Sequence, residues 1–370
     1  TASWPWNYPL SADHMLRGNF VILVWSLAFA LAASSRSRRS RVPVRAHTPL
    51  PSTPLAAAAA GAIAVVAATY VVLSVGWDEL VGAGRARPAE AASWIGWMAN
   101  FIAPTVPALV CAGAFLIGRK RPAWRPLAFA AFLTTVLLVS PIYSSRYLVA
   151  GLYLPLLLAA APARLFRKPR FDLFLLLVIV VAFPLMYSLK FATFTQVWDS
   201  LSWNVGHSPF VGVDFDAYSM LVRIAAYADT NGLQLGARLL STLLYMVPGM
   251  ATVAGPHTGG LVASADGADY TNVSAPLPAE LYLDFGYIGM AIGAYLLARL
   301  VRGLDDRFQE TGGLSVPSVF TLMYLFSMSY LVFVVRGSLQ QTALRFVAVL
   351  APLFALHCVL TAMDSTSRST

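Results

Sequence analysis

The stretch NVSAPLPAELYLDFGYIG, residues 272–289, places two carboxylates at the start of an apolar segment. Prolines close the preceding loop, and the apolar run that follows from Leu281 to Leu297 is long enough, with its flanks, to span a bilayer. We therefore expect Glu280 in the first turn of a buried helix, with Asp284 one turn deeper on the same face. Because an ionisable residue is costly at that depth, both acids are candidate functional residues.

The composition of the whole chain indicates a polytopic membrane protein. Hydrophobic residues make up 58% and charged residues only 12%, and the mean hydropathy is +0.66. The net charge of +9 does not favour a nucleic-acid partner, because the basic residues are concentrated in short loops between apolar runs. Cys111 and Cys358 both lie in apolar runs, far apart in the sequence, so neither a disulfide nor a zinc site is expected.

Apolar windows predict an all-α bundle of about nine membrane spans. The predicted spans cover residues 20–33, 55–75, 94–117, 126–140, 147–161, 171–189, 279–298, 316–335 and 342–362. The sequence is thus divided into N-terminal membrane helices (1–189), a segment with amphipathic helices (190–278) and C-terminal membrane helices (279–370). Gly286, Gly289 and Gly293 in the seventh span predict close helix packing of the GxxxG kind.

The distribution of basic residues predicts the orientation. Loops 34–45, 118–125 and 164–170 each carry a cluster of Arg or Lys and alternate with loops that lack one, so they are expected on the cytoplasmic side. Segment 190–278 then faces outward and the C-terminus inward. Residue 1 falls outside, and we expect at least one further span before it.

The outward segment has internal structure of its own. Residues 216–228 place Met220, Leu221, Ile224 and Ala228 on one face with Arg223 off it, which is typical of a helix lying at the membrane interface. Residues 238–250 are apolar but too short to cross, and predict a re-entrant or interfacial segment. Residues 255–270 are rich in Gly, Asp and Thr and predict a mobile loop. The lack of an internal repeat weighs against a transporter built from inverted repeats.

Four stretches resemble the O-antigen polymerase-like family, the Wzy-type polymerases of oligosaccharide repeat units. The stretches are APLPAELYLDFGYIG (275–289), SSRYLVAGLYLPLLL (144–158), GARLLSTLLYMVPGM (236–250) and VVRGSLQQ (334–341). The chain departs from the family pattern at Gly249, since an arginine often follows that proline in the family.

The resemblance implies an inverting, metal-independent glycosyltransferase at the outer face of the bacterial cytoplasmic membrane. The donor would be a growing glycan on undecaprenyl pyrophosphate, and the acceptor the terminal hydroxyl of a second lipid-linked repeat. No cofactor is implied, and a chain-length regulator is left open as a partner. A sugar hydroxyl is a weak nucleophile and a pyrophosphate leaving group develops negative charge, so the reaction calls for a general base and fixed cations.

Glu280 is the first candidate for the base, and Asp284 is the competing acid. The alternative interpretation of Glu280 is an acid at a helix N-terminus, stabilised by the helix dipole. Arginine suits a pyrophosphate because its planar fork binds phosphate oxygens in bidentate fashion. Arg146 and Arg336, at outer helix ends, are the first candidates, followed by Arg223, Arg238 and Arg345. Each of these side chains has the alternative of snorkelling or of binding lipid phosphate without specificity.

Tyr282, His257 and His207 are candidate substrate-binding residues. A related O-antigen ligase would share the fold and the donor and would use a histidine as base, so the two histidines distinguish these enzymes. A lipid or glycan transporter would instead require charged residues along a path through the bundle. Two acidic pairs, Asp78–Glu79 and Asp214–Asp216, also allow other interpretations, the first as the acidic pair of a lipid-phosphosugar transferase and the second as a helix cap.

Overall fold

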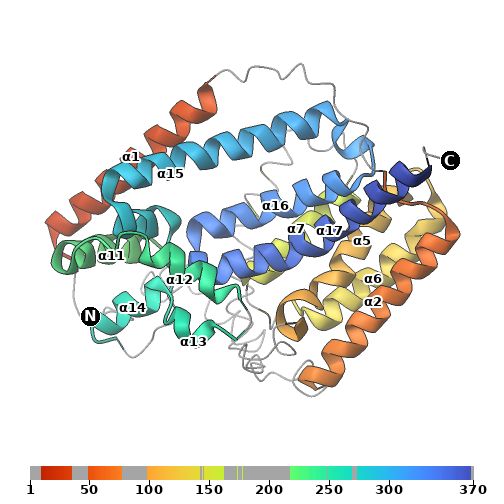
Figure 1. The fold of residues 1–370 in the computed structure, drawn as a ribbon, viewed down its shortest axis with the longest axis horizontal. Helices are drawn as coiled ribbons and strands as arrows, with labels where there is room; N and C mark the ends of the chain where they lie inside the picture. Colours follow the sequence, from red (N-terminus) through yellow and green to blue (C-terminus); the bar gives the residue numbers. More distant parts are fainter. Residues whose placement is uncertain are drawn as a thin grey trace. The chain divides into compact units, whose positions relative to one another are not determined.

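The computed structural model describes the chain as a set of helices (Figure 1). It describes residues 10–35, 49–76, 98–141, 144, 146–161, 173, 177, 217–247, 249–268 and 273–367. Within these ranges the extended structure is limited to a single antiparallel bridge between Pro49 and Ser318. The predicted all-α class is therefore confirmed.

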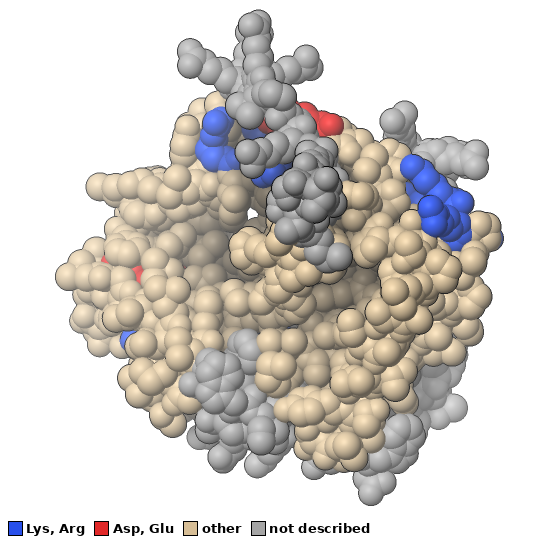
Figure 2. Space-filling view, turned by 45° about the vertical axis from the view of Figure 1, so that its right-hand side comes forward, with Lys and Arg blue, Asp and Glu red and all other residues tan. Residues whose placement is uncertain are grey.

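Five of the described helices are long and apolar enough to cross a membrane. They are α1 (Ala12–Ser34), α2 (Pro54–Val75), α15 (Leu277–Glu310), α16 (Val319–Arg336) and α17 (Leu339–Ser367). Shorter apolar helices are α5 (Thr105–Gly118), α6 (Arg125–Leu138) and α7 (Arg146–Ala160). These helices coincide with eight of the predicted spans, whereas span 171–189 lies outside the described residues except at positions 173 and 177. The chain is a multi-pass membrane protein. Figure 2 shows one face on which most atoms belong to uncharged residues, as contact with lipid requires.

The chain forms two compact units, each built from segments that are distant in sequence. The first comprises the described parts of Thr1–Pro43, Val211–Arg307 and Tyr330–Leu344, and the second those of Val44–Phe210, Phe308–Ser329 and Arg345–Thr370. The sequence-based division into 1–189, 190–278 and 279–370 stays a prediction. Asp78, Glu79, Asp214 and Asp216 lie outside the described residues, as do most of the predicted basic loops 34–45 and 164–170.

The second unit is organised around α5, which packs against α6 and α7. The small residues of α5 are buried, and the Cys111 thiol donates to the Ala128 carbonyl at 3.3 Å. Both cysteines were expected to be small core residues from their apolar surroundings; this is confirmed for Cys111 and wrong for Cys358, which is exposed. A π-helical turn (Met98–Ile102) and a 3-10 turn η2 (Pro122–Trp124) flank α5, and a 3-10 turn η8 (Gly313–Ser315) precedes α16.

Arg119, directly after α5, binds the C-terminal end of α7. Its guanidinium donates to the carbonyls of Leu158 at 3.1 Å and Ala159 at 2.9 Å, to that of Ala161, and through Nη1 to that of Leu314 at 3.1 Å. The last carbonyls of a helix have no partner within the helix, so Arg119 satisfies groups that would otherwise be orphaned. One side chain thereby joins α5, α7 and the turn before α16.

In the first unit, α11 (Ala217–Asn231) packs against α1. The predicted apolar face is confirmed, because Met220, Leu221, Ile224 and Ala228 are all buried. The prediction that Arg223 lies away from the buried surface is wrong, since its side chain is only 7% exposed. The reason is that α11 is covered on more than one side: a Cβ atom at Gly18 of α1 would lie 2.5 Å from Val222 Cγ2.

Three short helices follow α11: α12 (Ala237–Tyr245), α13 (Ala251–Ala254) and α14 (Thr258–Ala265). The predicted short apolar segment at 238–250 thus forms α12 and a turn in which Gly249 has a φ of 85°. The prediction of a loop throughout 255–270 is wrong, because α14 occupies its centre. α14 can form there because Gly259 lets the helix approach the backbone closely: a Cβ atom at this position would lie 2.5 Å from the Val273 carbonyl oxygen.

Helix α15 is broken at Gly286, where φ is 66° and ψ is −161°. This conformation is accessible to glycine and strained for other residues. A short helix from Leu277 to Phe285 therefore carries both acids, and a longer helix continues from Tyr287 to Glu310. The predicted span 279–298 is not one continuous helix. Cβ atoms at Gly289 and Gly293 would collide with Phe285 and Leu281, so these glycines pack the two parts of α15 against each other, rather than two separate helices.

Replacing Arg119 by Met removes all of its bonds to the α7 carbonyls. We expect a loss of about 2–3 kcal/mol in the free energy of unfolding, because hydrogen bonds to a charged group are among the stronger ones. Thermal unfolding in detergent measures this loss as a lower apparent Tm. The matched control is Lys120→Met, which removes one charge from the exposed neighbouring side chain. An equal change in Tm for both variants would contradict the role of Arg119.

Candidate functional site

Glu280 lies in the first turn of α15, as predicted, and is only 2% exposed. Its Oε2 accepts the backbone N–H of Leu339 at 3.0 Å, and the Thr258 hydroxyl donates to the same carboxyl group. Leu339 is the first residue of α17 and Thr258 is the first residue of α14. The Glu280 side chain thus joins the N-terminal ends of three helices.

The negative charge of Glu280 is placed where α17 needs an acceptor. The first N–H groups of a helix have no partner within it, and its N-terminus carries a partial positive charge. The turn that precedes α17 consists of Gly337 and Ser338, and its short side chains leave space for a carboxylate from α15. The alternative interpretation of Glu280 as an acid that stabilises a helix N-terminus is therefore supported. Glu280 stabilises the N-terminus of α17 in addition to that of its own helix, α15.

Asp284 is fully buried and caps a different helix. Its Oδ1 accepts the backbone N–H of Arg238 at 3.0 Å, and its Oδ2 accepts that of Leu239 at 3.0 Å. Both groups belong to the first turn of α12, which follows Gly236 in a left-handed conformation with a φ of 91°. The Gln234 N–H donates to the Leu283 carbonyl at 2.9 Å, which adds a backbone contact. Asp284 therefore determines where α12 begins.

The capping of α12 brings Arg238 to Glu280. The backbone of Arg238 is held by Asp284, and its guanidinium charge interacts electrostatically with Glu280. Its Nε atom is buried and has no hydrogen-bond partner among the residues that the structure describes. A buried donor without an acceptor is costly unless a ligand supplies one. Of the predicted arginines, Arg238 is the one that the described contacts place beside both acids.

The other predicted arginines have different surroundings. Arg223 forms an ion pair with Asp266, with 3.0 Å between Nη1 and Oδ2. Arg336 is the exposed last residue of α16, three residues before Leu339. Arg345 belongs to the second unit, where its guanidinium carbon lies 5.4 Å from the centroid of the Phe101 ring. Arg146 opens α7 in that same unit, but its side chain is outside the described part of the chain.

His257 is the N-cap of α14, next to Thr258. Its Nδ1 accepts the Gly260 N–H at 3.1 Å, and burial lowers the pKa of the imidazole. A neutral imidazole whose Nδ1 accepts a hydrogen bond carries its proton on Nε2. In this arrangement His257 presents a donor rather than a free basic nitrogen. The prediction that it contacts substrate is compatible with that donor, whereas His207 lies outside the described residues.

Tyr282 lies between Glu280 and Asp284 in the sequence, and its side chain is buried. Its ring centroid lies 4.8 Å from that of Tyr287 at an interplanar angle of 66°. This edge-to-face pair joins the two parts of α15 across the break at Gly286. Tyr282 thus has a packing role in the structure, and its predicted contact with substrate stays a prediction.

Thr258, Ser338 and Gln340 were not among the predicted site residues. The hydroxyl of Ser338 is buried beside Leu339 without a hydrogen-bond partner among the described residues, and Gln340 Nε2 donates to the Gly255 carbonyl at 3.2 Å. Small polar residues such as these carry no pattern that marks them in the sequence. The adjacent glycines of TGG (258–260) and RGS (336–338) were the available signals, because glycine often marks a close approach of backbone segments.

A comparison with family models supports the resemblance seen in the sequence. The family whose model matches is described as O-antigen polysaccharide polymerase Wzy, and the match covers residues 276–364. It begins one residue before α15 and includes Glu280, Asp284 and Arg336, so the predicted resemblance is confirmed over this part of the chain. A search of curated proteins and a search of solved structures each found no match.

Substituting Asp284 by Asn turns one of the two acceptors at α12 into a donor that faces a backbone N–H. We expect a loss of about 1–3 kcal/mol in the free energy of unfolding, because a buried donor is left without an acceptor. Thermal unfolding in detergent, read as apparent Tm, measures this loss. Glu310→Gln, at the exposed end of α15, is the charge-matched control and should leave Tm unchanged. An Asp284→Asn variant as stable as the parent would show that α12 does not depend on this cap.

Proposed function

We propose, from the match of residues 276–364 to the O-antigen polymerase family, that this membrane protein polymerises oligosaccharide repeat units linked to undecaprenyl pyrophosphate. The observation that carries the proposal is the buried Glu280 carboxylate, which lies within the matched region and interacts with the Arg238 guanidinium. Such a pair supplies the two elements that glycosyl transfer from a pyrophosphate needs, a proton acceptor and a fixed cation.

In the proposed reaction, Glu280 accepts the proton of the acceptor sugar hydroxyl. The hydroxyl oxygen attacks the anomeric carbon of the donor glycan and forms the new glycosidic bond. The bond between that carbon and the pyrophosphate oxygen breaks at the same time, and the electron pair leaves with undecaprenyl pyrophosphate. A single displacement of this kind inverts the anomeric configuration and needs no metal ion, provided that the protein neutralises the leaving group.

Arg238 is the proposed partner of the pyrophosphate. Its buried Nε is a donor for which the described residues offer no acceptor, and a guanidinium fork binds phosphate oxygens well. Arg336 is a second proposed contact. It ends α16 three residues before Leu339, whose N–H binds Glu280. Arg146, Arg223 and Arg345 stay weaker proposals, and the ion pair of Arg223 with Asp266 already offsets its charge.

Asp284 acts in this proposal as a positioning residue. Both of its carboxylate oxygens are engaged by backbone N–H groups of α12, which hold the backbone of Arg238 in place. Because the described partners of Asp284 are backbone N–H groups of α12, we assign it to the support of that helix rather than to the chemistry. The roles proposed for the two predicted acids are therefore different, with Glu280 in the chemistry and Asp284 in the support of Arg238.

The outer face of the cytoplasmic membrane is the proposed location of the reaction. The support is the alternation of basic loops in the sequence, which directs segment 190–278 and the beginning of α15 outward. A ligase that transfers the completed glycan is the nearest alternative. The geometry of His257 weighs against that alternative, because its Nδ1 already accepts the Gly260 N–H. A transporter built from inverted repeats is disfavoured by the lack of an internal repeat in the sequence.

Replacing Glu280 by Gln should abolish polymer and leave single-repeat material in cells. The amide oxygen still accepts the Leu339 N–H, so the packing is largely kept while the proton acceptor is lost. We expect polymerisation to fall by about 10²–10⁴-fold, the usual contribution of a general base. Gel analysis of cell-surface glycan and turnover of lipid-linked repeats by the purified protein measure the effect.

The control for this variant is Thr258→Val, which removes a hydrogen bond from the same carboxylate but keeps the base. If both variants lower apparent Tm and activity equally, Glu280 is a structural cap rather than the base. Normal chain lengths in Glu280→Gln would exclude it from the chemistry altogether.

His257→Asn distinguishes the polymerase from the ligase. Asparagine is a good N-cap, so α14 should still form, and only the imidazole chemistry is removed. A polymerase that uses Glu280 should keep at least about a third of its activity in this variant. A loss as large as that of Glu280→Gln, with unchanged Tm, would instead favour a histidine base and the ligase. The transfer assay is run with a repeat-unit acceptor and with a ligase acceptor in parallel.

A further inference from the structure

Helix α1 and the membrane-crossing part of α15 run side by side in the first unit (Figure 1). Near their beginnings the rings of Phe20 and Tyr287 meet edge to face, with centroids 5.2 Å apart. Near the end of α1, Arg299 Nη1 donates to Ser35 Oγ at 2.9 Å, and Arg302 Nη1 donates to the Ala33 carbonyl. The two helices are thus parallel and in contact at both ends of a stretch of about four turns, roughly 22 Å long.

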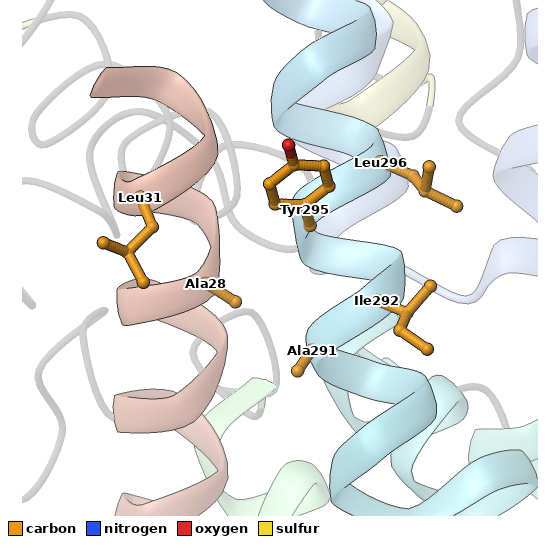
Figure 3. Close-up of a pocket in the computed structure, with 6 residues that line it drawn as sticks. All are labelled: Ala28, Leu31, Ala291, Ile292, Tyr295 and Leu296. Atoms are coloured by element: carbon orange, nitrogen blue, oxygen red, sulfur yellow. The ribbon is translucent and has the colours of Figure 1, made fainter. Parts of the chain in front are cut away.

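A groove lies between these two contacts. Its volume is about 370 Å³, within the usual range for ligand pockets. Figure 3 shows the small side chains of Ala28 and Ala291 facing the space between the helices, which they leave unfilled. The residues that line the groove are Ala28, Leu31, Ala291, Ile292, Tyr295 and Leu296. Leu31 is 68% exposed and Leu296 is 61% exposed, so the groove opens to the surroundings of the two membrane helices.

Two arginines lie at one end of the groove. Tyr295, Arg299 and Arg302 follow one another at three- to four-residue spacing and so share a face of α15. Each guanidinium has five N–H donors, and the bonds to α1 engage Nη1 in each case, so donors are left for a further acceptor. Asp305 and Asp306 follow Arg302 by three and four residues, so they lie near its face of α15, whereas Arg299 is more than one turn away from both. Arg299 and Arg302 are the described cations nearest to this end of the groove, and in the sequence α1 is followed by five more arginines up to residue 45.

We propose that the groove binds one acyl chain of an anionic phospholipid, whose phosphate is held by Arg299 and Arg302. The apolar lining matches a hydrocarbon chain, and the arginine pair at its end matches a phosphate that accepts bidentate hydrogen bonds. Basic pockets between membrane helices at the cytoplasmic side are recognised sites for anionic headgroups. The basic loop after α1 predicts that this end of both helices faces the cytoplasm.

This lipid differs from the substrate proposed above. Glu280 and Arg238 belong to the beginning of α15, before the break at Gly286, whereas Arg299 and Arg302 follow more than three turns after it. The headgroup site is therefore separated along α15 from the proposed pyrophosphate site. The inference does not depend on the proposed enzymatic function, and its test measures lipid binding alone.

The test uses the purified full chain in nanodiscs and in neutral detergent, with dioleoylphosphatidylglycerol as the anionic probe and dioleoylphosphatidylcholine as the zwitterionic one. Native mass spectrometry during lipid titration measures the affinity for each. We expect saturable binding of phosphatidylglycerol, and at least about tenfold weaker binding after the double substitution Arg299→Gln and Arg302→Gln. Filling the groove by Ala291→Phe should lower phosphatidylglycerol affinity to a similar extent, although the arginines are kept.

The matched control is Arg307→Gln, which removes one charge from α15 on a different face of the helix. It should bind phosphatidylglycerol as the parent does. The affinities of two variants are compared only if both have the apparent Tm of the parent in detergent. If the double variant does not fold, Ala291→Phe and the single substitution Arg299→Gln carry the test. Glycerol 3-phosphate at the same concentration should not displace the lipid.

Four outcomes would overturn the proposal. Equal affinity of the parent for the two lipids would show that the arginines do not select an anionic headgroup. An equal loss in Arg307→Gln and in the double variant would show a general effect of surface charge. Displacement by glycerol 3-phosphate, or full affinity in Ala291→Phe, would show that the groove does not hold an acyl chain.

Discussion

The arrangement of the first unit depends on two carboxylates, one turn apart on a short helix, that bind the N-termini of other helices. Glu280 accepts the first N–H of α17 and the hydroxyl at the start of α14, and Asp284 accepts two N–H groups of α12. A buried charge is tolerated only when hydrogen bonds and opposite charge compensate its desolvation. The helices α12, α14, α15 and α17 therefore meet at these acids. This is the place where we propose that Glu280 acts as the base.

The break at Gly286 makes this meeting point compatible with a membrane helix. A continuous helix through residues 279–298 would place the acids in line with an apolar span. With the break, the short part of α15 folds against the long part, and the contacts of Gly289 and Gly293 with Phe285 and Leu281 secure the bend. The acids can then face α12, α14 and α17, while the rest of α15 runs beside α1 and leaves the groove that ends at Arg299 and Arg302.

Much of this architecture was predictable because hydropathy and charge are local properties of the sequence. The membrane helices, the burial of Met220 and Ile224 on α11, and the position of Glu280 in a first helical turn all followed from periodicity and run length. The errors arose where tertiary contacts outweigh local pattern. Residues 258–265 form α14, which packs closely on the backbone at Gly259, and Arg223 is buried with Asp266 as its partner.

The sequence by itself determined that the chain is a helical membrane protein and that Glu280 and Asp284 are exceptional positions. It could do so because a charge in an apolar run is recognisable without knowledge of its partners. Only the tertiary structure decided that the two acids differ in their partners, and that the backbone of Arg238 binds Asp284 while its charge acts on Glu280. Those relations join residues about forty positions or more apart. They depend on where the N-terminus of each helix lies in space. Every residue except proline carries a backbone N–H group, so the sequence does not show which of these groups will bind a distant carboxylate.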